Sequence, residues 1–166
     1  MDLFFMRHAT AEPRERYTDD FQRPLTAEGR QSHQRVARLL VPLLQPVHHI
    51  LSSPLVRARQ TADIVAEAVQ FAGEVQETPV LGGDCTVGAV LDLLQGYARE
   101  ARILCVGHEP DMSRLSAVFL DGEGRSAMAF QPGAVLGLRF PGHPAPGRGI
   151  LRFFLRPAEA LSLVER

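Results

Sequence analysis

Four side chains that favour oxyanions follow three apolar segments of the chain. Arg7 and His8 come directly after LFFM, Arg57 lies shortly after the segment VHHILS, and His108 follows RILCVG. Arginine offers a planar fork of donors that matches phosphoryl oxygens, and imidazole adds further ring nitrogens. If the three segments are parallel strands of one sheet, their carboxyl ends bring these side chains to a common edge. The pattern therefore predicts an anion site for a phosphoryl group.

The rest of the sequence has the pattern of an alternating α/β fold. Short apolar runs that are typical of strands alternate with segments whose apolar residues recur at helical spacing. The expected strands are LFFM, VHHILS, EVQETPVL as a weak edge, RILCVG, and the pair GAVLGLRF and GILRFFLRP, which the Gly/Pro-rich PGHPAPGRG joins as a closing hairpin. This order predicts a three-layer α/β fold with a largely parallel sheet.

Four helices are expected between these strands. The first spans about residues 27–45, with Thr26 as its N-cap and Pro42 as a kink or early stop. The second is SSPLVRARQTADIVAEAV, with Ser53 as its N-cap. The other two are TVGAVLDLLQGYA and about residues 111–120.

Length and composition limit the classes of protein. The 166 residues fit one domain, 1–166, and the 18 basic and 19 acidic residues give a formal net charge of −1. This balance argues against nucleic acid or an anionic membrane as the main partner. Cys85 and Cys105 lie outside any metal-ligand spacing and read as reduced thiols of a cytoplasmic protein without a secretory signal. No carboxylate cluster suits Mg²⁺ or Zn²⁺, so we expect no metal and no cofactor.

The motifs MRHATAE, RPLTAEGR, SSPLVRARQTA and VGHEPDMS together resemble the histidine phosphatase superfamily, and within it the SixA-type phosphohistidine phosphatases. The resemblance spans about residues 1–120 and implies the phosphoglycerate mutase-like fold, a six-stranded mixed sheet with one antiparallel strand between helices. It also implies that His8 is a transiently phosphorylated nucleophile, that Arg7 and Arg57 clamp the phosphoryl oxygens, and that His108 completes the pocket.

Two residues depart from the pattern of that family. Ala9 stands where most members have glycine, and its methyl group disfavours a positive φ, so the turn should be regular there. Glu109 replaces the more usual asparagine and places an extra carboxylate at the rim of the pocket. That carboxylate would either weaken anion binding or assist proton transfer.

A nucleophilic histidine must be neutral and must present the correct ring nitrogen. The two guanidinium groups should lower the pKa of His8, because like charge disfavours imidazolium. The second ring nitrogen should donate to a backbone carbonyl, which fixes the tautomer. Charge on the equatorial phosphoryl oxygens would then be stabilised by Arg7, Arg57 and His108.

An acid for the leaving group is difficult to identify. Superfamily members that cleave phosphate esters carry a glutamate on an inserted segment, and this chain has room there for only one edge strand and one helix. Asp84 and Glu77 are weak candidates for the proton donor, and Glu109 is a third. A phosphohistidine needs less help, since imidazole has a pKa of about 6.5 and leaves readily. The missing acid therefore favours a substrate with an N–P bond.

The favoured function is a metal-independent phosphatase that forms a phosphohistidine intermediate and dephosphorylates phosphohistidine proteins, such as a histidine phosphotransfer domain. The alternative is a small-molecule phosphomonoesterase of the same fold. A phosphoglycerate-type mutase is less favoured because the acid-bearing insertion is missing. A non-catalytic phosphate-binding module is disfavoured, since a binder needs no nucleophile.

Other polar residues have simpler interpretations. Arg59 should point away from the surface that Arg57 faces, and Arg23 is better explained as a salt bridge or loop anchor than as a substrate contact. The polar stretch 9–25 is long for a connection. Its charged residues form a solvated face that could meet a protein partner.

Overall fold

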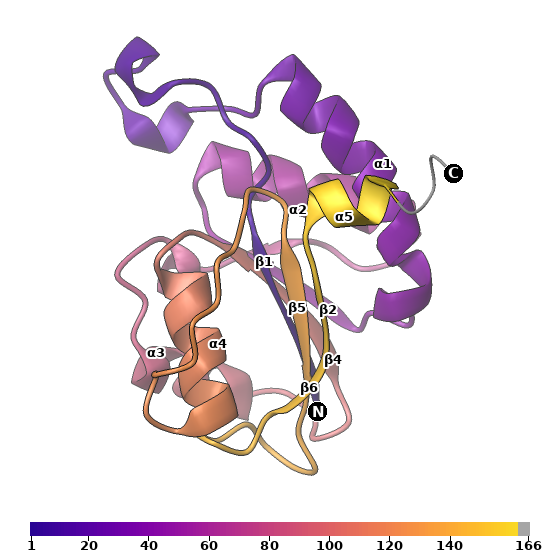
Figure 1. Cartoon of the computed structure of the whole chain (residues 1–166), viewed down its shortest axis with the longest axis vertical. Helices are drawn as coiled ribbons and strands as arrows, with labels where there is room; N and C mark the ends of the chain where they lie inside the picture. The colour runs from indigo at the N-terminus through magenta and orange to yellow at the C-terminus, as the bar shows by residue number, and fades with distance from the viewer. Residues whose placement is uncertain (163–166) are drawn as a thin grey trace.

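Six strands form one mixed sheet in the computed structural model, which describes residues 1–162 (Figure 1). They are β1 (Asp2–Arg7), β2 (His49–Ser52), β3 (Gln76–Glu77), β4 (Arg102–Gly107), β5 (Val135–Arg139) and β6 (Ile150–Leu155). Their order is β3-β2-β4-β1-β5-β6. Strands β1 to β4 pair in parallel, whereas β5 is antiparallel to both of its neighbours. The expected sheet, with one antiparallel strand, is confirmed.

Helices cover both faces of this sheet (Figure 1). One layer contains α1 (Ala27–Leu44), α2 (Val56–Ala68) and α5 (Pro157–Ser162), and the other contains α3 (Val87–Gln95) and α4 (Asp111–Asp121). Successive side chains of β1 point to opposite faces, as the pleat requires. Phe4 and Met6 pack into the core beneath α1 and α2, while Leu3 and Phe5 join the core beneath α3 and α4. Strand β1 is therefore buried on both sides.

One expectation about a helix boundary is wrong, and another is confirmed. Helix α2 begins at Val56, after Leu55 as its N-cap, and Ser53 instead accepts a hydrogen bond from the Leu55 N–H at 3.2 Å. Helix α1 ends at Leu44, so its expected span is confirmed, and Pro42 lies inside the helix without stopping it. The side chain of Leu44 is fully buried, so packing against the sheet holds the last turn in place despite the proline. No helix in residues 1–162 is both long enough and apolar enough to cross a membrane.

The chain between β1 and α1 leaves the body of the protein as a projecting segment, hereafter the 12–24 loop (Figure 1). It contains two short 3-10 helices, η1 (Arg14–Arg16) and η2 (Asp20–Gln22). Hydrogen bonds close its base: the Thr26 N–H donates to the Thr10 carbonyl at 3.1 Å, and the Glu12 N–H donates to the Pro24 carbonyl at 2.9 Å. The loop is therefore fixed at its ends.

Gly29 is expected to be indispensable for this closure. A methyl group there would lie 2.2 Å from the Thr10 carbonyl oxygen, a backbone atom that cannot move without opening the loop base. Gly29→Ala should therefore lower the free energy of unfolding by about 2 kcal/mol or more. Gly88→Ala is the matched control, because no atom lies within 4 Å of the added methyl group. It should stabilise the protein by roughly 0.5–1 kcal/mol. Urea unfolding of both variants measures the difference, and equal effects would contradict this account.

Candidate active site

The structure brings together the four residues that the sequence selected. His8 follows β1, His108 follows β4, and Arg57 comes from the first turn of α2, so three segments meet beyond the carboxyl ends of the strands. The His8 and His108 ring centres lie 5.2 Å apart, and the Arg57 Nε lies 3.3 Å from the His8 Nε2. His8, Arg57 and His108 are buried, and Arg7 is half-buried.

Hydrogen bonding fixes the tautomer of His8. Its Nδ1 lies 2.7 Å from the carbonyl oxygen of Ala9. A carbonyl can only accept, so Nδ1 carries the proton and Nε2 keeps the lone pair. The pKa of His8 is lowered to about 3, mainly by burial and also by the charges of His108, Arg57 and Arg7, against the opposing effect of the Ala9 bond. The expected direction is confirmed, but burial rather than the guanidinium groups is the main cause.

Ala9 adopts a backbone conformation open to any residue, as expected. The residues other than glycine with positive φ in the described chain are Gln70 and Asp84. The Ala9 N–H donates to the Thr61 Oγ1 at 3.0 Å, which connects the turn to α2. This connection holds the carbonyl that orients His8.

His108 is fixed by Ser53. The His108 Nε2 and Ser53 Oγ are 2.7 Å apart, while the Nδ1 of His108 is buried with no protein partner. Burial, followed by the charge of Arg57, lowers the pKa of His108 to about 4. Ser53 is thus a partner of the site and not the helix cap that its position suggested.

The two arginines are bound to oxygen atoms of the protein. The Arg7 Nη1 donates to the Phe130 carbonyl at 2.7 Å, while its buried Nε has no partner. Arg57 donates from Nη1 to the Asp20 carbonyl at 2.8 Å and from Nη2 to the Asp20 carboxylate at 2.9 Å. Sequence reasoning missed Asp20, because nothing in the sequence indicates a contact across such a separation.

The three candidate proton donors have different surroundings. Glu109 lies at the site: one carboxylate oxygen accepts from the Ser113 hydroxyl at 2.7 Å, and the other is buried without a partner. Burial raises the pKa of Glu109, although Ser113 and the charge of Arg7 oppose the shift. Asp84 is exposed at φ 54°. Glu77 forms an ion pair with Arg59 at 2.9 Å on the edge of the sheet. Arg59 also pairs with Asp63, so Arg59 has the structural role that was expected.

Comparisons with known proteins agree with this geometry. Residues 3–82 match the model of the histidine phosphatase superfamily (branch 1). The chain is 30% identical to phosphohistidine phosphatase SixA of Escherichia coli over 125 residues, which cover 74% of this chain and 76% of that protein. It is 35% identical to an uncharacterized protein of Picosynechococcus sp. over 141 residues, which cover 84% of this chain and 85% of the relative.

A solved structure of the protein histidine phosphatase SixA complexed with tungstate is also similar. Its TM-score is 0.82 at 28% identity, covering 96% of this chain and 99% of that one. The chain therefore belongs to the histidine phosphatase superfamily. Within that class it is a SixA-like phosphatase.

Both site imidazoles should remain neutral under mildly acidic conditions. In the unfolded chain histidine titrates near 6.5, so below this pH the unfolded state binds more protons than the folded state, in which burial lowers both pKa values. The stability that these rings contribute is present above pH 6.5 and falls as the pH drops towards 4. NMR titration of ring carbons in the native protein should show neutral His8 and His108 at pH 5. Midpoints near 6.5 for the two site rings would contradict the burial argument.

Proposed function

We propose that this chain is a metal-independent phosphohistidine phosphatase that works through a phosphorylated His8. The observation that carries the proposal is the bond from His8 Nδ1 to the Ala9 carbonyl, which leaves Nε2 as a neutral, oriented nucleophile beside Arg57. A pure phosphate-binding module would gain nothing from such a fixed lone pair.

The first half of the reaction transfers the phosphoryl group to the enzyme. The His8 Nε2 forms a bond to phosphorus while the bond to the leaving group breaks, and the leaving atom keeps that electron pair and takes up a proton. Arg7, Arg57 and His108 stabilise the negative charge on the equatorial oxygens. Tungstate, the ligand of the similar SixA structure, is an oxyanion and fits this assignment.

The second half returns the enzyme to its starting state. A water oxygen attacks phosphorus, the bond from phosphorus to Nε2 breaks, and its electron pair returns to the ring. The water loses one proton to solvent, and orthophosphate leaves. The low pKa of His8 favours this step, because the ring re-forms in its neutral state.

A phosphohistidine protein, such as a histidine phosphotransfer domain in the cytoplasm, is the substrate that suits this site best. Its leaving imidazole needs little protonation, and the SixA relative carries the name of this activity. A small-molecule phosphomonoesterase is the second candidate, and Glu109 favours it. A carboxyl group whose pKa is raised by burial is the kind of acid that an alkoxide leaving group requires.

Removal of His8 should abolish turnover, because no other group supplies the bond-forming atom. His108→Ala should keep measurable activity, with kcat lowered roughly a hundredfold, since it removes one stabilising contact. His143→Ala, in an exposed loop, serves as the control. Steady-state kinetics on a phosphorylated histidine phosphotransfer domain would compare the variants, in the presence and absence of EDTA. Full activity in His8→Ala would refute the nucleophile assignment, and loss of native activity on chelation would refute metal independence.

Substrate choice separates the two candidates. The kcat/KM for phosphohistidine should exceed that for alkyl phosphates at least roughly a hundredfold, the scale that a well-placed acid contributes, with aryl phosphates between them. Glu109→Gln should change phosphohistidine hydrolysis little, and Asp84→Asn and Glu77→Gln serve as controls at two solvent-exposed carboxylates. Alkyl esters cleaved as fast as phosphohistidine, with that activity lost in Glu109→Gln, would establish the phosphomonoesterase instead.

A further inference from the structure

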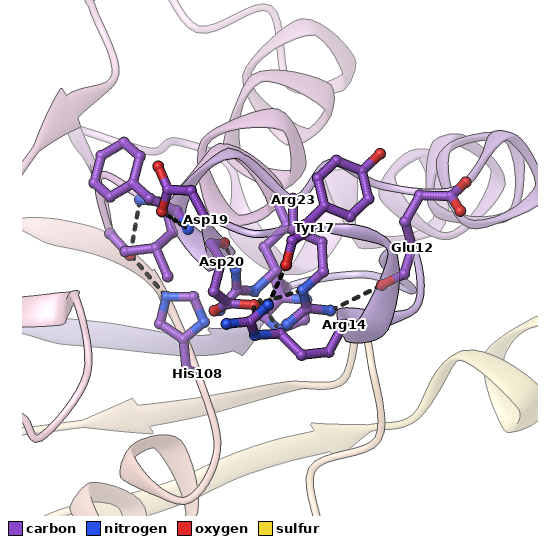
Figure 2. Close-up of polar contacts among 12 residues, drawn as sticks. Glu12, Arg14, Tyr17, Asp19, Asp20, Arg23 and His108 are labelled. Carbon is purple, nitrogen blue, oxygen red and sulfur yellow. Dashed lines mark hydrogen bonds and ion pairs between the residues drawn. The ribbon is translucent and has the colours of Figure 1, made fainter.

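The carboxylate of Asp20 lies among three guanidinium groups. Its Oδ1 is 2.7 Å from the Nε of Arg23 and 3.3 Å from the Nε of Arg14 (Figure 2). Its Oδ2 is 2.9 Å from the Nη2 of Arg57. The side chain of Asp20 is 34% exposed, whereas that of Arg57 is 6% exposed. A loop carboxylate therefore extends inward to a buried cation of the active site.

Each nitrogen of the Arg57 guanidinium has a hydrogen-bond partner in this state. Nη1 and Nη2 both donate to Asp20, and Nε points at the His8 Nε2. A phosphoryl group that takes the Nη1 and Nη2 donors of Arg57 in two parallel hydrogen bonds must displace Asp20, because the oxygens of Asp20 and of the phosphoryl group compete for these donors. The charge of Asp20 also opposes the lowering of the His108 pKa.

We propose that Asp20 determines the specificity of this site, an inference that rests on the function proposed above. Asp20 is an internal anion that occupies Arg57 in the free enzyme, and it has to release Arg57 when a phosphoryl group binds. A small anion has to displace Asp20 without forming any contact outside the pocket that would compensate for the lost ion pair. A phosphorylated protein can offset it by touching the 12–24 loop, where Phe21 is 41% exposed next to Asp20. The residue thus selects against free phosphate and small esters.

The loop is built so that this release is feasible. No residue of η1 or η2 is buried, so moving these turns breaks few apolar contacts. Arg14 and Arg23 belong to the same loop as Asp20 and can travel with it. The carboxylate therefore keeps two cationic partners when it leaves Arg57, and no charge is left unpaired.

Asp20→Asn tests this role, because it keeps the shape of the side chain and removes the charge. Orthophosphate and tungstate binding, measured by calorimetry at fixed ionic strength, should tighten at least about tenfold, the scale of a hydrogen bond to a charged group. The KM for an aryl phosphate should fall with kcat nearly unchanged, and the KM for a phosphorylated histidine phosphotransfer domain should change less. Asp20→Ser is a second variant in case the amide makes new hydrogen bonds, and thermal unfolding checks that both variants fold.

Asp19→Asn is the matched control. It removes the same charge from the neighbouring position, where the carboxylate caps η2 by accepting from the Phe21 N–H at 2.9 Å. Anion affinity in Asp19→Asn should stay near the native value. Unchanged or weaker anion binding in both Asp20 variants, with reduced kcat, would overturn the proposal and show that Asp20 merely positions Arg57. Anion binding needs no turnover, so failure of the proposed phosphatase activity would be seen separately, in the rates.

Discussion

Convergence of four potential cations at one end of a buried sheet is the constraint on which the rest of this structure depends. Arg7, His8, Arg57 and His108 lie close together, and like charges at such distances repel strongly where water is scarce. The repulsion is limited because burial keeps both imidazoles neutral. The guanidinium groups keep their charge: Arg7 donates to the Phe130 carbonyl, and Arg57 donates to Asp20. The buried Arg7 Nε and His108 Nδ1 have no protein partner within residues 1–162, so both remain available to a phosphoryl group.

The fold supplies this arrangement through its strand order. Strands β1 and β4 are adjacent and parallel, so His8 and His108, which follow them, emerge side by side. Behind them the Gly133 N–H donates to the carbonyls of Arg7 and His8, at a backbone φ of 81° that glycine adopts without strain. The turn after β1 is thus held from one side by Thr61 and from the other by Gly133.

Sequence alone predicts most of this site, because strand ends are local features. Apolar runs followed by Arg-His or Gly-His locate His8 and His108, and the parallel pattern implies that these residues meet. Three features could not be predicted, since they depend on packing between distant segments. Ser53 bonds to His108 rather than capping α2, burial outweighs charge in lowering the pKa of His8, and Asp20 folds back onto Arg57. The i,i+3 spacing of Asp20 and Arg23 indicates only their own ion pair.

The claim that most needs direct evidence is that the neutral Nε2 of His8 carries the phosphoryl group. Rapid quenching of the native protein during turnover of a phosphorylated histidine phosphotransfer domain, followed by mass spectrometry under mildly alkaline conditions, would trap the intermediate. NMR of the phosphorylated peptide would then identify the nitrogen. We predict phosphate on His8, bonded to Nε2, because Nδ1 is held by the Ala9 carbonyl. Turnover without any phosphorylated His8, or phosphate on Nδ1, would contradict this account.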